Sequence, residues 1–216
     1  MIRHYETTFA TNLIAKRFDE EHPWRPDWFV AVSDAPHQAE YYQYFCRGVL
    51  GARKGSIVSE QNWDLLGDLS TLALSVRVFS DGKPEWVRST ARSTDEGSFD
   101  EGYEYCKYAM SHLVTFQAAV LMGFDTLFLI GFDGNFRPQL EDGTDVCHFT
   151  KDYWSEFQQN RPKDEEFWTR MNHGHMVAHS FVRSMEEEHN FKVINCTPDS
   201  VYKMYDYMPF KEAIRA

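Results

Sequence analysis

Cysteine pairs and long apolar runs are both missing from this sequence. The four cysteines of the 216-residue chain are scattered without a C-x-x-C pair, so we expect neither a zinc ribbon nor a thiol redox motif. The longest apolar stretch, 120–131, is interrupted by Gly123 and Asp125 and is shorter than the roughly 18 residues that a membrane span needs. The first residues lack the apolar core and cleavage site of a signal peptide. We therefore expect a soluble cytoplasmic protein without a membrane span.

Positive charge is scarce as well. The formal net charge is −11, and binding to nucleic acid needs a positive surface, so no nucleic-acid partner is expected. Three motifs are also absent: G-x-G-x-x-G, G-x-x-x-x-G-K-[ST] and G-x-S-x-G. Their absence excludes a standard dinucleotide fingerprint, a P-loop and the nucleophile elbow of α/β-hydrolases.

What the sequence does contain is an alternation of short apolar runs and amphipathic segments. The run 126–130 is apolar on both faces, which is typical of a strand inside a parallel sheet. We expect a single domain over residues 1–216, α/β and Rossmann-like, with a mainly parallel sheet and helices on both faces. The patterns predict strands at 28–33, 56–59, 72–79, 126–130 and 192–196, and helices at 36–53, 108–122 and 176–188.

Polar residues follow the strand 126–130, where open parallel sheets bind their ligands. Asp133 and Asn135 lie in this GFDGNF segment. They fit an Asx-turn equally well, and two such ligands without a third are a weak signal for a hard cation. His148 and Tyr153 follow in a polar loop. That loop either closes over a ligand or packs its aromatic residues without one.

Three histidines fall within the segment NHGHMVAH: His173, His175 and His179. His175 and His179 share a helix face at i, i+4, a spacing that can chelate a transition metal, but H-E-x-x-H is absent and no metal is predicted. Surface or capping roles are equally open to them. His173 precedes the predicted helix 176–188, so we expect it at the positive end of the helix dipole. That position keeps an imidazole neutral, the form that a general base needs.

The segment 111–133, SHLVTFQAAVLMGFDTLFLIGFD, resembles the helix–strand core of the bacterial sialyltransferases of glycosyltransferase family 42. It is closer still to a related domain of unknown function described as 6-hydroxymethylpterin-diphosphokinase-like. The order GFDGNF, CHFTKDYW, helix, strand and Pro209-Phe210 is similar to the carboxyl half of that relative. FATNLIAKRF followed by PDWFVAVSD is similar to its early segment. The resemblance covers residues 9–33 and 111–210.

The resemblance implies an inverting, metal-independent glycosyltransferase without a cofactor. Its donor would be a nucleotide-activated sugar, with a CMP-linked sugar as one candidate, and its acceptor is open. The resemblance also implies roles for particular residues: nucleotide contacts by Asn12 and by Ser33 or Asp34, a sugar-phosphate site lined by Ser111 and the turn Gly131–Asp133, and a general base at His173.

The chain departs from the family at two places. Family members begin with a strand and a G-x-G-P-S-like turn that cradles phosphate, whereas only eight residues precede Phe9 here. Asn135 stands where the first of two phosphate-steadying tyrosines is expected. We therefore expect this chain to lack the family's first strand, and the open sheet edge to be covered by another element or a second copy. Two alternatives remain: a pterin diphosphokinase-like enzyme, or an inactive nucleotide-binding or partner protein.

Overall fold

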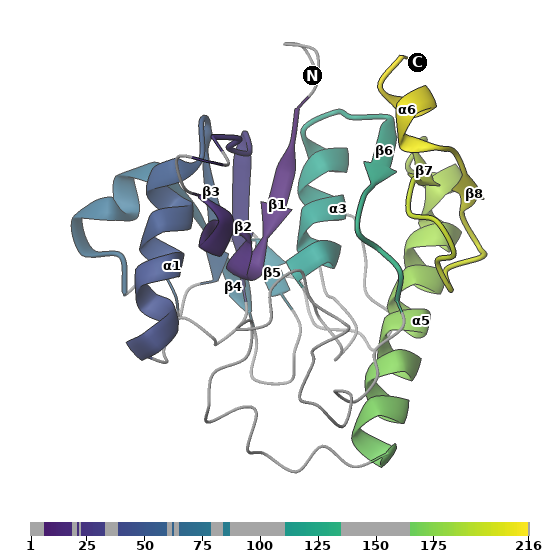
Figure 1. The fold of residues 1–216 in the computed structure, drawn as a ribbon, viewed down its shortest axis with the longest axis horizontal. Helices are drawn as coiled ribbons and strands as arrows, with labels where there is room; N and C mark the ends of the chain where they lie inside the picture. The colour runs from purple at the N-terminus through teal and green to yellow at the C-terminus, as the bar shows by residue number, and fades with distance from the viewer. Residues whose placement is uncertain are drawn as a thin grey trace. The chain divides into compact units, whose positions relative to one another are not determined.

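The chain divides into two compact units, Met1–Phe124 and Asp125–Ala216. Each unit has its own sheet of mainly parallel strands (Figure 1). We call them unit 1 and unit 2. The structure is a computed structural model, and it describes residues 7–18, 21, 23–32, 39–59, 62, 65–78, 84–86, 111–134 and 165–215.

Unit 1 is built on a five-stranded sheet with the order β1-β2-β3-β4-β5. The first four strands are parallel, and β5 runs antiparallel to β4. Parallel neighbours need crossover connections, and the helix Ala39–Gly51 lies in the crossover from the second strand to the third. The strands are β1 (Phe9–Thr11), β2 (Trp28–Ala31), β3 (Gly55–Ser59), β4 (Ala73–Val78) and β5 (Pro84–Trp86).

β1 is a strand that the sequence analysis did not assign. Its three residues pair in parallel with Trp28, Phe29 and Val30 of β2. The sheet therefore contains a parallel strand before β2. Three residues are too few to show a strand periodicity, so this strand is defined by its pairing with β2 rather than by its own pattern.

The starts of β1 and β2 are joined through the buried carboxylate of Asp27. Its Oδ2 accepts hydrogen bonds from the backbone N–H of Thr8 at 2.9 Å and from the Thr8 hydroxyl at 3.2 Å. Arg53 and Lys54 approach the same carboxylate at 3.2 and 3.7 Å. Burial acts to raise the pKa of Asp27, but the Thr8 hydrogen bond and the two positive charges outweigh it and lower the pKa.

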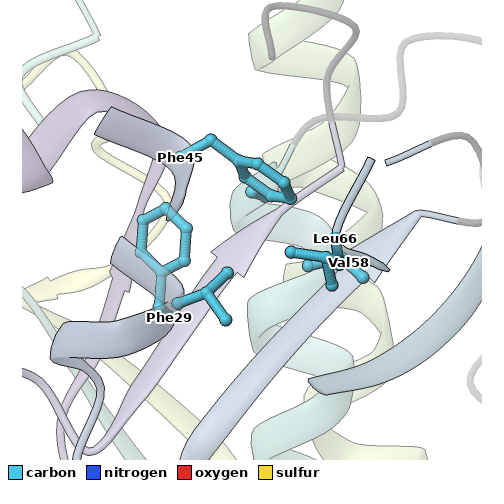
Figure 2. Packing of buried hydrophobic residues seen from close by; sticks show 6 residues of the cluster. Phe29, Phe45, Val58 and Leu66 are labelled. Atoms are coloured by element: carbon cyan, nitrogen blue, oxygen red, sulfur yellow. The ribbon is translucent and has the colours of Figure 1, made fainter. Parts of the chain in front are cut away.

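The core of unit 1 lies between β2, β3 and helix α1 (Ala39–Gly51). Figure 2 shows Phe29, Phe45, Val58 and Leu66 packed together in this core. Helix α3 (Ser111–Leu121) contacts β1 and β2, and Figure 1 shows it on the other side of the strands from α1. Helices thus lie on both sides of the strands of this sheet. Two 3₁₀ helices, η1 (Asn12–Arg17) and η3 (Gly67–Leu72), complete the unit.

Unit 2 has a three-stranded parallel sheet with the order β6-β7-β8. Helix α5 contacts β7, and the carboxyl-terminal helix α6 contributes Ala213 to a cluster with Ile194 and Cys196. The elements are β6 (Thr126–Leu129), α5 (Glu165–Glu188), β7 (Lys192–Asn195), β8 (Asp206–Tyr207) and α6 (Phe210–Ala213).

Helix α5 is longer than predicted and buries a different stripe. It begins at Glu165, so Gly174 lies within the helix rather than before it. In the predicted helix 176–188 the apolar residues Val177, Phe181 and Met185 are spaced by four and would share a buried face, but Val177 is exposed and the other two are only half-buried. The prediction was wrong because three polar side chains occupy the buried stripe. Its buried residues are His175, Ala178, His179, Val182 and Glu186.

Glu186 joins α5 to β7. Its carboxylate is buried, pairs with Arg183 one turn earlier, and accepts a hydrogen bond from the backbone N–H of Val193 at 3.3 Å. A buried carboxylate is tolerated only with such partners. This contact therefore fixes the start of β7 against the helix.

The α/β class and the mainly parallel strands are confirmed. The prediction that the strand 126–130 is buried on both faces is wrong, since Thr126 and Phe128 are exposed while Leu129 is buried. β6 is an edge strand of its sheet, whereas the central strand β7 is buried from Val193 onward. Within the described ranges, no helix is long and apolar enough to cross a membrane.

Candidate functional site

The ends of β6 and β7 lie side by side, because Leu129 is paired with Asn195 in the parallel register. After β6 the chain passes through Gly131–Gly134, which we call the carboxyl-edge turn. After β7 it passes through Thr197–Tyr205. Open parallel sheets bind ligands beyond the carboxyl ends of their strands, so these two segments form the candidate site.

Two glycines shape the carboxyl-edge turn. Gly131 and Gly134 have positive φ angles of 78° and 70°, a backbone conformation that side chains disfavour. Gly134 is also crowded, since a Cβ atom there would lie 2.5 Å from Cζ of Tyr202. The turn can therefore lie directly against the Tyr202 ring only because glycine occupies this position.

Three polar side chains from the end of β7 and the following loop hold the carboxyl-edge turn in place. The backbone N–H of Phe132 donates to the Thr197 hydroxyl at 2.8 Å, and the Ser200 hydroxyl donates to the Phe132 carbonyl at 2.6 Å. The Asn195 amide donates to the Ser200 oxygen at 2.8 Å, and its own carbonyl oxygen accepts from the backbone N–H of Thr197. Because Asn195 and Ser200 are buried, these bonds are shielded from water and fix the turn.

Asp133 is the charged residue of this turn, and it is exposed. Its backbone carbonyl accepts a hydrogen bond from the N–H of Val201 at 2.8 Å. Burial raises the pKa of the Tyr202 phenol, and the negative charge of Asp133 raises it further. The carboxylate therefore lies near Tyr202 on a rigid turn while remaining open to solvent. An ionised carboxylate only accepts hydrogen bonds, so it suits a hydroxyl-bearing ligand.

Two buried histidine–tyrosine pairs lie next to the carboxyl-edge turn. Nδ1 of His175 is 3.2 Å from the Tyr202 hydroxyl, and Nδ1 of His179 is 2.9 Å from the Tyr205 hydroxyl. The rings of His179 and Tyr202 lie against each other, with their centroids 4.0 Å apart and their planes tilted by 32°. Phe132 of the turn meets the His179 ring edge-to-face at 5.9 Å. Helix α5, the turn and the loop after β7 thus share one aromatic cluster.

The protonation states in this cluster follow from burial. Burial lowers the pKa of His175 to about 4. The pKa of His179 falls to about 3, chiefly through burial and in part through repulsion by a protonated His175. Burial also raises the pKa of Tyr205, as it does for Tyr202. At neutral pH both imidazoles are uncharged and both phenols keep their protons.

His173 lies on α5 but away from this cluster. Its side chain is exposed, and at about 100° per residue it points nearly opposite to His175. We expected it to precede the amino terminus of the helix, and this is wrong because α5 begins at Glu165. The dipole argument for a neutral imidazole therefore does not apply to it. Its role as a general base stays a prediction.

The other predicted site residues are distributed over both units. Gly131 and Asp133 lie together in the carboxyl-edge turn of unit 2, as expected from the strand–turn pattern. In unit 1, Ser111 is the buried first residue of α3, and Asn12 is the first residue of η1 after β1. The remaining predicted residues lie outside the described residues: Ser33, Asp34, Asn135, His148 and Tyr153.

Sequence reasoning missed the residues that build this site around Asp133. The segment Thr197-Pro198-Asp199-Ser200 after β7 has turn composition, which by itself indicates a turn and not a site. The spacing of Asn195, Thr197 and Ser200 was the available signal, since such side chains commonly bond to nearby backbone. Tyr202 and Tyr205 gave no local signal. Their histidine partners are more than 25 residues away in the chain.

Comparison with known proteins adds no relative: no family model, no curated protein and no solved structure matches this chain.

Proposed function

We propose that the chain is a nucleotide-sugar transferase of the sialyltransferase-like type, with its donor bound at the carboxyl-edge turn. The observation that carries this proposal is the fixed turn itself, which presents an exposed carboxylate at the carboxyl end of a parallel strand. Ligand sites of open α/β sheets occur at such positions. Gly131, Phe132 and Asp133 of the turn also lie within the segment 111–133, which is part of the family resemblance.

The proposal also assigns both units to one Rossmann-like domain. Both units have parallel strands with helices, which is compatible with one Rossmann-like domain spanning the whole chain. Asp133 would accept hydrogen bonds from hydroxyl groups of the sugar or the ribose rather than contact phosphate, because two negative charges repel each other.

The proposed reaction is a one-step inversion. An acceptor hydroxyl attacks the anomeric carbon, the bond from that carbon to the phosphate oxygen breaks, and the nucleoside phosphate leaves with the electron pair. The acceptor proton passes to the general base, for which His173 is the candidate. Its exposure on α5 supports this role, since an acceptor has access to the ring. No metal ion enters this scheme.

A thermal-shift screen of the full chain tests whether it binds a nucleotide. We expect one of CMP, UDP or GDP to raise the melting temperature without magnesium, because a ligand that binds only the folded state stabilises it. Stabilisation by ATP alone, and only with magnesium, would favour the diphosphokinase alternative instead. No stabilisation by any of these nucleotides would contradict the proposal.

A matched pair of variants then locates the ligand. Asp133→Asn removes the charge at the carboxyl end of β6, and Asp125→Asn removes an exposed charge next to its amino end. We expect Asp133→Asn to weaken binding of the nucleotide sugar roughly tenfold or more, since a hydrogen bond to a charged group is worth about 1.5–3 kcal/mol. Asp125→Asn should bind like the unaltered chain in calorimetry. If both variants bound the nucleotide sugar with equal affinity, Asp133 would not be part of the binding site.

A further inference from the structure

His175 and His179 are placed on α5 as a chelating pair. They lie one helical turn apart, both side chains are buried, and a ring nitrogen of one is within 4.8 Å of a ring nitrogen of the other. Two imidazoles at i, i+4 on a helix are a common arrangement for binding a transition metal. The sequence alone left surface or capping roles open, but the burial of both rings in unit 2 removes the surface role.

The tyrosines orient the two rings. The Tyr205 hydroxyl donates its one proton to the backbone carbonyl of His179 at 3.1 Å, so its contact with Nδ1 of His179 uses an Nδ1–H donor. The lone pair of His179 is then on Nε2. The hydroxyl of Tyr202 contacts Nδ1 of His175 at 3.2 Å. In protein metal sites, the second ring nitrogen of a ligating histidine is usually held by such a hydrogen bond.

We propose that His175 and His179 bind a divalent transition-metal ion of the Zn²⁺ class through their Nε2 atoms. Imidazole nitrogen suits Zn²⁺, Ni²⁺ and Cu²⁺, whereas Mg²⁺ and Ca²⁺ prefer oxygen ligands. The two rings fill two coordination positions, and water or other groups fill the rest. This inference goes beyond the transferase proposal, whose chemistry uses no metal.

The position of His175 and His179 indicates that a bound metal ion would stabilise the fold. Through Tyr202 and Tyr205, the two rings connect α5 to the segment after β7. An ion that holds both rings would therefore fix the helix against that segment. Because the paired geometry exists only in the folded chain, the binding free energy adds to the stability of the fold.

The test is a calorimetric titration of the metal-free, full-length chain with Zn²⁺, followed by Co²⁺ absorption spectroscopy. We expect one Zn²⁺ to bind per chain and the melting temperature to rise with it. His175→Ala and His179→Ala should each weaken Zn²⁺ binding by more than about tenfold, and Tyr205→Phe, which keeps the ring, by about 10–100-fold. His173→Ala on the opposite side of α5 is the matched control and should bind Zn²⁺ with unchanged affinity.

Two results would overturn the metal site. One is an unaltered chain that binds neither Zn²⁺ nor Co²⁺. The other is a folded His175→Ala chain that binds Zn²⁺ as tightly as His173→Ala does. Should His179→Ala fail to fold, the His175→Ala and Tyr205→Phe chains decide the question. Nucleotide binding measured in the presence of a chelator keeps this test separate from that of the transferase proposal.

Discussion

The two glycines of the carboxyl-edge turn provide a quantitative test of how this turn is packed. Both have positive φ, so replacing either with alanine costs about 1–2 kcal/mol in backbone strain. A Cβ atom on Gly131 would have no neighbour within 4 Å, whereas one on Gly134 would overlap the Tyr202 ring. Overpacking of this kind costs about a further 1–3 kcal/mol. We therefore expect losses of about 1–2 kcal/mol for Gly131→Ala and about 2–5 kcal/mol for Gly134→Ala.

Urea denaturation of the two variants, followed by circular dichroism, measures both losses. The comparison uses the shift of the unfolding midpoint at unchanged slope, since a changed slope would mean that the variants unfold differently. The backbone term is common to both variants, so the difference between them reports the contact with Tyr202. Equal losses of stability for Gly131→Ala and Gly134→Ala would refute the placement of Tyr202 against the turn.

Three further predictions concern other parts of the chain. The pKa of Asp27 is lower in the folded chain than in the unfolded chain. The ionised carboxylate therefore stabilises the fold at any pH above the ordinary aspartate pKa, and this stabilisation is lost as the pH falls through the lowered pKa of the folded chain. Asp27→Asn should therefore be less stable by about 1 kcal/mol at pH 7 and nearly equal to the unaltered chain in acid, as urea titrations at several pH values would show. Glu186→Ala leaves the buried N–H of Val193 without its acceptor and should lower the free energy of unfolding by about 1–3 kcal/mol. The exposed control, Glu187→Ala, should change it by no more than about 0.5 kcal/mol. In single-turnover kinetics, His173→Ala should slow transfer by about 10²–10⁴ at unchanged donor affinity, and full activity would exclude His173 as the base.

The strands of this fold were predictable where their residues are β-branched and apolar. The runs at 56–59, 126–130 and 192–196 were placed within two residues of β3, β6 and β7. β1 and β5 have three residues each and were not predicted. Such short strands form because their backbone N–H and C=O groups hydrogen-bond to a neighbouring strand. The local sequence pattern does not show which strand will be the neighbour.

The predicted helix begins at residue 176, after Gly174, whereas α5 begins at Glu165. A glycine inside a helix costs only about 1 kcal/mol, and the packing of the buried stripe of α5 outweighs that cost. The stripe was misplaced because hydrophobicity does not predict that His175, His179 and Glu186 are buried. These side chains are buried because Tyr202, Tyr205 and the backbone of Val193 satisfy them, and those partners come from elsewhere in the chain.

In the candidate site, the position of Asp133 was predictable and its surroundings were not. An apolar strand followed by Gly131-Phe132-Asp133 indicates a turn at the carboxyl edge of a sheet, and the structure places it there. The hydrogen bonds that hold the turn come from Asn195, Thr197 and Ser200, more than 60 residues later. Contacts over such a distance in sequence depend on the pairing of β6 with β7, which local patterns do not reveal.

Hydrogen–deuterium exchange of the full chain, with and without the nucleotide that stabilises it, tests the central claim most directly. Amide exchange reports local opening, so a ligand that contacts a segment slows exchange there. The proposal predicts slower exchange in the carboxyl-edge turn Gly131–Gly134 and in Thr197–Tyr202, which holds it. A bound nucleotide that leaves both segments unchanged and protects other parts of the chain would contradict the placement of the donor site.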